Sequence, residues 1–353
     1  MDGQYNLLDY ARQFDENGKE YQVVRILDKN SPIIRDAITV ESNSDSGHEY
    51  AILNGLPSVV WRRAYEGVTP TKGSQTVVKE TYGRMSCVSE LDVAIAEKGG
   101  NVAAMRAANL ENRLEAMTQE AASKLIYGAK DKDEKAFVGF AARYSSLTND
   151  KNTKNASQVV DFGAGTEESG NVFTSIYLIG WAKGKIFTFF PKGTRAGIKT
   201  YDFSAAGPIN LEDANGGTYP GYKEQAEWLM GLAVQDWRYG ARICNIPNPA
   251  TLSVDDKIKL YEKFMYAVGQ IHNLENCKLV AYCSRATKDA LRIGYMKSGG
   301  VTVYQQNNMT SSGNQGYANH DLVIDGIHIK AEDAIVHTEA WVKRPEEESS
   351  VAI

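Results

Sequence analysis

The sequence is poor in cysteine, has no long apolar run and has no strong excess of charge of either sign. Its four cysteines (Cys87, Cys244, Cys277 and Cys283) are too few and too scattered for a disulfide framework, and we expect small buried side chains. No apolar run lies at the amino terminus and no apolar stretch is long enough to cross a bilayer, so we expect the protein to be neither exported nor membrane-spanning. The 39 basic and 44 acidic residues leave a net charge of −5, so no global basic field is expected to attract nucleic acid.

Motifs that carry catalytic or ligand chemistry are also missing. His337-Thr-Glu339 resembles part of a zinc-deaminase signature, but no Pro-Cys-x-x-Cys follows it. Gly163-Ala-Gly165 lacks the third glycine of a dinucleotide-binding loop, and neither a G-x-S-x-G elbow nor an H-E-x-x-H pair occurs. The sequence therefore predicts no catalytic residue, no cofactor and no metal ligand, and the chain is not expected to be an enzyme.

The first segment, residues 1–45, has little apolar material of its own. A short helical pattern is followed by a polar, acidic stretch, and residues 1–60 hold ten Asp and Glu against five Lys and Arg. Such a segment is expected to lie extended over something else. An ordinary amino-terminal pair of strands is the alternative.

A long hairpin is predicted next. Residues 57–64 (PSVVWRRA) and 75–82 (QTVVKETY) are rich in β-branched and aromatic residues, and glycine and proline separate them. Both faces of this ribbon carry charges, so it cannot bury much surface alone. The charged residues are Arg62, Arg63, Lys79 and Glu80.

Residues 101–127 form the clearest predicted helix. Asn101 can cap its start and Gly128 follows its end. A helix of this length is a rod of roughly 40 Å. One apolar stripe is expected to face the core, formed by Leu110, Leu114, Met117, Ala121 and Leu125.

The second half of the chain predicts a buried sheet and an α/β unit. Residues 173–190 are expected to form a strand pair buried on both faces. Ser253 and Asp256 form a capping box before a helical stripe. A strand at 278–283, a helix from Ser284 to Gly299, a strand at 301–305 and a hairpin at Asp325-Gly326 follow.

The stretch from Ala233 to Ile246 alternates between apolar and charged residues, which predicts one strand with two different faces. Asp236, Arg238 and Arg242 fall on the charged face. This face is expected to lie against something polar and ordered.

The order of these segments carries a resemblance to a known family. The matching residues include Leu56-Pro57, Trp61-Arg62, Glu66-Gly67-Val68, Ile126-Tyr127-Gly128, Phe190-Pro-Lys-Gly193, Gly231-Leu232, Asp236-Trp-Arg-Tyr239, Arg242-Ile243, Tyr282-Cys-Ser-Arg285 and Asp325-Gly-Ile327. In order and spacing they resemble tailed-phage major capsid proteins of the HK-97 fold, and they are most similar to the podophage capsid family typified by phage epsilon-fifteen.

The resemblance implies an α+β, HK-97-type fold in five parts. They are an N-terminal arm (1–45), an E-loop hairpin (46–90), a peripheral domain (91–250) with a long spine helix (101–127), an axial α/β domain (251–340) and an acidic tail (341–353).

The same resemblance implies the function and partners. The chain would be a major capsid protein that self-assembles into pentamers and hexamers of an icosahedral head around double-stranded DNA, without sequence-specific binding and without a membrane. It would be assembled in the host cytoplasm and reside in the virion, with separate scaffolding, portal and decoration (cement) proteins. The candidate inter-subunit contacts are Trp61, Arg62, Arg63, Glu66, Lys72, Asp236, Arg238 and Arg242. For the last three, an inter-subunit contact and pairing inside the monomer are two alternatives that the sequence leaves open.

Two other classes remain open at this point. An encapsulin-type shell protein would share the fold without a genome, and a cytoplasmic enzyme could be built on the same α/β unit. Some members of the capsid family cross-link a loop lysine covalently to an asparagine; Lys72 lies in the predicted loop, but no partner can be assigned to it.

Overall fold

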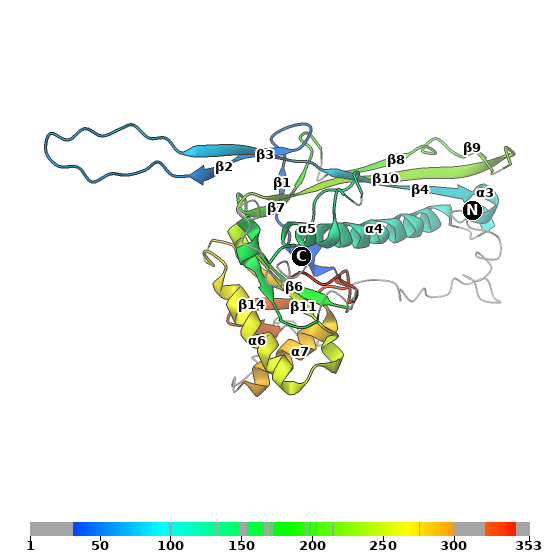
Figure 1. Cartoon of the computed structure of the whole chain (residues 1–353). Coiled ribbons are helices and arrows are strands. Elements are labelled where there is room, and N and C mark those ends of the chain that lie inside the picture. Colours follow the sequence, from blue (N-terminus) through cyan, green and yellow to red (C-terminus); the bar gives the residue numbers. More distant parts are fainter. Residues whose placement is uncertain are drawn as a thin grey trace, which may run out of the picture.

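The computed structural model describes residues 31–343, except for 99–100, 132, 148–153, 166–169, 171, 195–196, 214, 275 and 299–321. It has a long upper layer of strands backed by one helix, and a more compact lower unit. In Figure 1 a bare hairpin leaves the upper layer on one side, and a helix-backed ribbon of strands leaves it on the other.

A twelve-stranded mixed sheet connects the two layers. At its centre β6 (Thr174–Trp181) is buried at every position, and β7 (Ile186–Phe190) is buried at all but its last. The predicted buried strand pair at 173–190 is therefore confirmed. The main path of the sheet runs β13-β14-β12-β6-β7-β10-β4, and β11 (Gly240–Ile246) pairs with both β6 and β5 (Val159–Asp161).

The lower unit contains the predicted helices and strands. α6 (Val254–Gly269) begins at Ser253, whose hydroxyl accepts from the Asp256 amide, and α7 (Arg285–Lys297) begins at Ser284. Their axes approach closely, because a Cβ on Gly294 would lie 2.0 Å from a carbonyl oxygen of α6. The remaining elements are β12 (Lys278–Cys283), β13 (Leu322–Ile324), β14 (Ile327–Ala331) and the 3-10 turn η4 (Pro249–Thr251). The predicted strand at 301–305 lies outside the described residues.

The predicted long helix is confirmed as α4 (Val102–Tyr127), with the Asn101 side chain accepting from the Ala104 amide. Its apolar stripe is only partly right. The carboxyl-terminal half packs into the main core, whereas Leu114 is 36% exposed. Sequence periodicity marked the apolar face correctly, but the neighbouring elements cover only part of that face.

A ribbon of long strands lies along α4. β4 (Gly83–Asp92) pairs antiparallel with β10 (Thr218–Val234), and two shorter strands, β8 (Ile198–Asp202) and β9 (Ile209–Glu212), also pair with β10. A small second core joins the ribbon to α4 and to α3 (Val93–Lys98). Its buried members are Leu91, Ala96 and Met105.

Only residues 31–45 of the predicted amino-terminal arm are among the described residues. Residues 1–30 lie outside them, so the extended arm stays a prediction there. From α2 (Pro32–Asp36) to β1 (Thr39–Glu41) the chain packs on its own body, where Ile33 is fully buried and β1 pairs with β7. Asp36 accepts from Lys278 at 2.7 Å and from Lys330 at 2.8 Å, which ties this segment to the lower unit.

The single alternating strand predicted at Ala233–Ile246 is wrong. β10 ends at Val234, a 3-10 turn η3 (Trp237–Tyr239) follows, and β11 begins at Gly240. Every residue of β11 is buried. The alternation predicted a solvent-facing side, but the sheet is covered on both faces here.

Candidate functional site

A highly exposed part of the described chain is the hairpin formed by β2 (His48–Gly55) and β3 (Ser74–Glu80). It extends beyond the body in Figure 1. The first predicted strand, 57–64, is wrong, because pairing ends at Gly55 and residues 56–73 form a long loop. We call this loop the hairpin tip. A loop of this length without helix or strand is unusual unless it has a function.

The hairpin tip presents large apolar side chains to solvent. Trp61 is 99% exposed and Val59 is 91% exposed, and Tyr65 and Leu56 are also largely exposed. Several large apolar side chains exposed within one loop are unfavourable in water and are typical of a segment that another molecule covers. Tryptophan and tyrosine are also the residues that most often dominate the free energy of protein–protein binding.

The charged candidates of the tip lie at its far end, where the chain turns. The backbone amide of Arg63 donates to the Glu66 carboxylate at 2.9 Å, and Arg62 donates to the Glu66 carbonyl at 3.3 Å. Tyr65 adopts a positive φ of 70° in this turn. Lys72 lies on the returning limb and is exposed. The tip thus combines apolar side chains with a net positive charge.

The root of the hairpin is held against the body by a buried ion pair. Glu80, at the end of β3, accepts from Arg143 through both oxygens at 2.8 and 2.7 Å. Arg143 ends the short helix α5 (Phe140–Arg143). Burial alone would lower the pKa of Arg143, but the Glu80 carboxylate raises it overall. Tyr50 of β2 donates to Glu80 at 3.1 Å and to the Val234 carbonyl at 2.9 Å.

His48, the first residue of β2, completes the root. Its ring lies edge-on to Phe187 with centroids 5.2 Å apart, and its Nε2 lies 3.1 Å from the amide nitrogen of Gln235. Its other ring nitrogen, Nδ1, is buried and meets no hydrogen-bond partner among the described residues. Burial lowers the pKa of His48, while the charge of Glu80 opposes this effect.

Asp236 and Arg238 pair with each other at the surface. The Arg238 guanidinium donates to both oxygens of Asp236, at 2.9 and 2.8 Å. Burial would raise the pKa of Asp236, but the bonds from Arg238 and the charge of Lys185 lower it. Arg238 is the more exposed partner, at 44% of its side chain. Arg238 is therefore open to a neighbouring molecule, whereas the side chain of Asp236 is only 15% exposed.

Arg242 is a correction to the candidate contacts. Its side chain is 6% exposed and lies 2.7 Å from Glu339, which is 5% exposed. The other donors of the guanidinium reach the Ser175 hydroxyl at 3.1 Å and the Tyr144 carbonyl at 2.9 Å. A charge satisfied in this way inside the monomer is not available to a neighbour. Of the two alternatives, internal pairing holds for Arg242.

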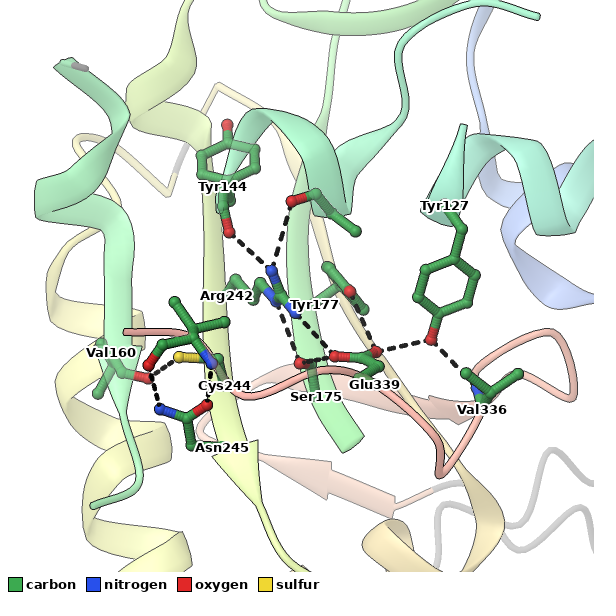
Figure 2. Close-up of polar contacts among 12 residues, drawn as sticks. Tyr127, Tyr144, Val160, Ser175, Tyr177, Arg242, Cys244, Asn245, Val336 and Glu339 are labelled. Atoms are coloured by element: carbon green, nitrogen blue, oxygen red, sulfur yellow. Dashed lines mark hydrogen bonds and ion pairs between the residues drawn. The ribbon is translucent and has the colours of Figure 1, made fainter. Parts of the chain in front are cut away.

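Glu339 is the centre of this buried cluster, shown in Figure 2. It accepts from Tyr127 at 2.6 Å, from Tyr177 at 3.2 Å and from Ser175. Burial raises the pKa of both tyrosines, so they remain neutral donors. The cluster joins the end of α4, two central strands and the carboxyl-terminal segment of the described chain.

A metal site and a membrane-spanning helix would each need particular side chains among the described residues. No group of three or more His, Cys, Asp or Glu side chains there could hold a metal ion. Within the same residues no helix is both long and apolar enough to cross a bilayer. The features that remain are the exposed hairpin tip and the buried contacts that hold its root.

Sequence patterns alone did not identify the partners of these charges. Arg143, Tyr50 and Glu339 were not candidates, although each is central to one of the two buried clusters. Arg242 and Glu339 are 97 positions apart, and Glu80 and Arg143 are 63 apart. The only available signal was the charge itself, in segments otherwise suited to burial.

A family model described as major capsid protein GP7 matches residues 15–343. None of the curated proteins matches the sequence.

Solved structures resemble the chain to different degrees. A chain of bacteriophage epsilon15, in a near-atomic structure derived from cryo-EM, aligns with a TM-score of 0.71 at 26% identity, covering 97% of this chain and 98% of that one. A chain of the holo-SrpI encapsulin complex from Synechococcus elongatus has a TM-score of 0.43 at 11% identity, over 67% and 94% of the two chains. A chain of the capsid of a native GTA particle has a TM-score of 0.44 at 10% identity, over 66% and 94%.

Proposed function

The chain belongs to the major capsid protein GP7 family, and from this premise we propose that its copies form pentamers and hexamers of an icosahedral head, with each hairpin tip seated on a neighbouring copy. The chain is a shell-forming protein of a phage virion and has the HK-97-type capsid fold. Family membership favours this function over the encapsulin-type shell protein and over the cytoplasmic enzyme.

The exposed hairpin tip is the observation that supports tip docking. Trp61 is almost wholly exposed in the single chain, and its neighbours Val59 and Val60 are also exposed. Burying such side chains between copies would remove apolar surface from water, and many weak contacts repeated around a closed shell add up by multivalency. In this proposal the hairpin is the E-loop, and residues 91–250 and 251–340 are the peripheral and axial domains.

The shell is proposed to enclose double-stranded DNA without reading its sequence. The net charge of −5 supports this, because a strongly basic lining would hold the packaged DNA tightly and hinder its release. Assembly in the host cytoplasm, with separate scaffolding, portal and decoration proteins, belongs to the same proposal.

The shell itself is tested by expressing the full chain, with and without its candidate scaffolding protein. Electron microscopy should show round, hexagon-outlined shells, and size-exclusion chromatography should show capsomers or megadalton particles. Small discrete oligomers under all conditions would contradict the proposed assembly.

Tip docking is tested by Trp61→Glu, with Trp61→Phe as the matched control. The glutamate should block shell formation, because it places an unpaired charge in an apolar contact, whereas phenylalanine retains an aromatic ring and should assemble. Both variants should fold, since residue 61 contacts solvent in the single chain. Normal shells from Trp61→Glu would show that the tip is not an inter-subunit contact at this residue.

A further inference from the structure

We propose that the buried Glu80–Arg143 ion pair is a clamp that sets the angle at which the hairpin leaves the body. The clamp thereby sets where the tip meets a neighbouring copy, and in this respect the inference rests on the proposed docking of the tip. Glu80 and Arg143 would be positioning residues for assembly, without contacting the neighbour themselves.

The clamp lies where both strands of the hairpin join the body. β3 ends at Glu80 and β4 begins at Gly83, so only Thr81 and Tyr82 separate the hairpin from the ribbon on the far side. On the other limb the chain leaves β1 at Glu41 and enters β2 at His48. A rotation of the hairpin needs dihedral changes in these two short connections only.

Beyond its root the hairpin has little of its own to fix its direction. Val77 of β3 is 71% exposed and Leu53 of β2 is 52% exposed. A two-stranded ribbon without a packed face is at best marginally ordered in water. The contacts of the root therefore decide the direction of the whole hairpin.

Arg143 is anchored to the body independently of the hairpin. Its Nε donates to the Val138 carbonyl at 3.2 Å, and its Nη2, which also bonds to Glu80, reaches the Leu232 carbonyl at 3.3 Å. The guanidinium thus presents two fixed, parallel donors to Glu80. Bidentate pairing of this kind fixes geometry as well as energy, because both bonds are lost when the carboxylate rotates.

Close packing of the backbone at the root restricts the positions that Glu80 can take. Gly47 has a φ of +155°, and a Cβ there would lie 2.1 Å from the Glu80 carbonyl oxygen. Tyr50 bonds both to Glu80 and to the Val234 carbonyl, so it bridges the hairpin and the body beside the ion pair. A carboxylate in this site has one well-defined position.

The angle can be measured with two spin labels on the full-length, unassembled chain. One label replaces exposed Val77 in the strand β3 and the other replaces exposed Lys199 on β8, in a background where the partly exposed Cys87 and Cys277 are serine. Labelled chain is diluted into unlabelled chain, so that only distances within one copy are observed. The wild-type chain should give a narrow distance distribution.

Glu80→Gln should broaden this distribution roughly two-fold or more, because the buried guanidinium loses its counter-charge in the clamped orientation. Glu49→Gln is the matched control. Glu49 lies on β2 next to His48, the residue that faces Glu80 across the hairpin. Its side chain pairs with Lys79 at 3.0 Å on the exposed face, so the control makes the same chemical change away from the buried ion pair. The control should keep the narrow distribution of the wild type.

A folded Glu80→Gln chain with a distribution as narrow as the wild type would overturn the proposal. If that variant does not fold, Arg143→Lys replaces it, since lysine keeps the charge but cannot form the bidentate bond. A broad distribution in Arg143→Lys supports the clamp, and a narrow one overturns it.

Assembly of the same variants separates this proposal from the docking of the tip. Glu80→Gln should form shells of irregular size, whereas Glu49→Gln shells should be uniform. Normal assembly of Trp61→Glu would contradict tip docking. The label distances would then still test whether the Glu80–Arg143 pair fixes the angle of the hairpin. Blocked assembly of Trp61→Glu, with a narrow distribution and uniform shells from Glu80→Gln, would retain tip docking and refute the clamp.

Discussion

Two long antiparallel ribbons leave the centre of the molecule in opposite directions (Figure 1). The hairpin β2–β3 has solvent on its sides, and Val77 in its middle is 71% exposed. The ribbon β4–β10 lies along α4, and Leu91 in its far half is 4% exposed. The two ribbons share a backbone geometry, so the difference between them comes from what covers their faces.

The covered ribbon also has its charges tied within the chain. Arg106 of α4 bonds to Glu224 of β10 at 2.6 Å and to Asp202 of β8 at 2.7 Å, and its guanidinium lies 5.1 Å from the centroid of the Tyr222 ring. The bare hairpin has such contacts at its root. One ribbon is therefore completed by its own helix, and we propose that the other is completed by a second copy.

The two ribbons should differ most when one apolar side chain is removed from each. Leu91→Ala should lower the free energy of unfolding by about 2–4 kcal/mol, because it leaves a cavity under α4. Val77→Ala should change it by about 0.5 kcal/mol or less, since the side chain is already in water. Urea unfolding of the unassembled protein measures both. Equal losses would mean that the hairpin is buried in the free chain.

A second test compares the ion pairs of the two ribbons. Arg106→Ala should lower the free energy of unfolding by about 1–2 kcal/mol, because two carboxylates lose a shared, partly buried partner. Lys79→Ala should lower it by about 0.5 kcal/mol or less, since Lys79 and Glu49 are both largely exposed. The same urea series measures both variants. A larger loss in the free energy of unfolding from Lys79→Ala than from Arg106→Ala would contradict the difference between the two ribbons.

The smallest expected effect is a pH dependence confined to the hairpin root. Burial lowers the pKa of His48, although Glu80 opposes this. The neutral form of His48 therefore stabilises the contact between the hairpin root and the body. This stabilisation is complete above pH about 6.5, the ordinary pKa of histidine, and is lost as the pH falls through the lowered pKa of His48 in the folded chain.

Hydrogen exchange of β2 and β3 between pH 8 and 5, corrected for intrinsic exchange rates, measures this dependence. Protection at the hairpin root should decrease towards pH 5, and β4 and β10 should keep theirs. His48→Gln should remove the pH dependence; if the variant retains it, another group at the root is titrating.

The elements that sequence analysis predicted well are those whose partners are local or uniformly apolar. Asn101 caps α4 and Ser253 caps α6, and each cap depends on residues within three positions. The buried strand at 174–181 was predicted because every residue in it suits a covered sheet. These features need no knowledge of distant residues.

The errors come from side chains whose partners are far away in the sequence or, as we propose, in another copy. Residues 57–64 have the composition of a strand, but propensity alone does not form one without a paired neighbour. Arg242 lies in an alternating pattern that predicts an exposed charged face, yet it is buried against Glu339, near the end of the described chain. Of the candidate contacts, the sequence placed Trp61 in the hairpin but in a strand of it, whereas it lies in the exposed loop, and the sequence could not place Arg242.

The near-continuity of β3 and β4 has a mechanical consequence. A pull on the hairpin is carried along one covalent strand, through Thr81 and Tyr82, into the ribbon on the opposite side. There the load falls on the ladder from Met230↔Gly83 to Gly221↔Asp92, whose hydrogen bonds are perpendicular to the strands. A force along β4 therefore shears these bonds together and does not open them one after another, so tension from one side of the subunit is transmitted to the other.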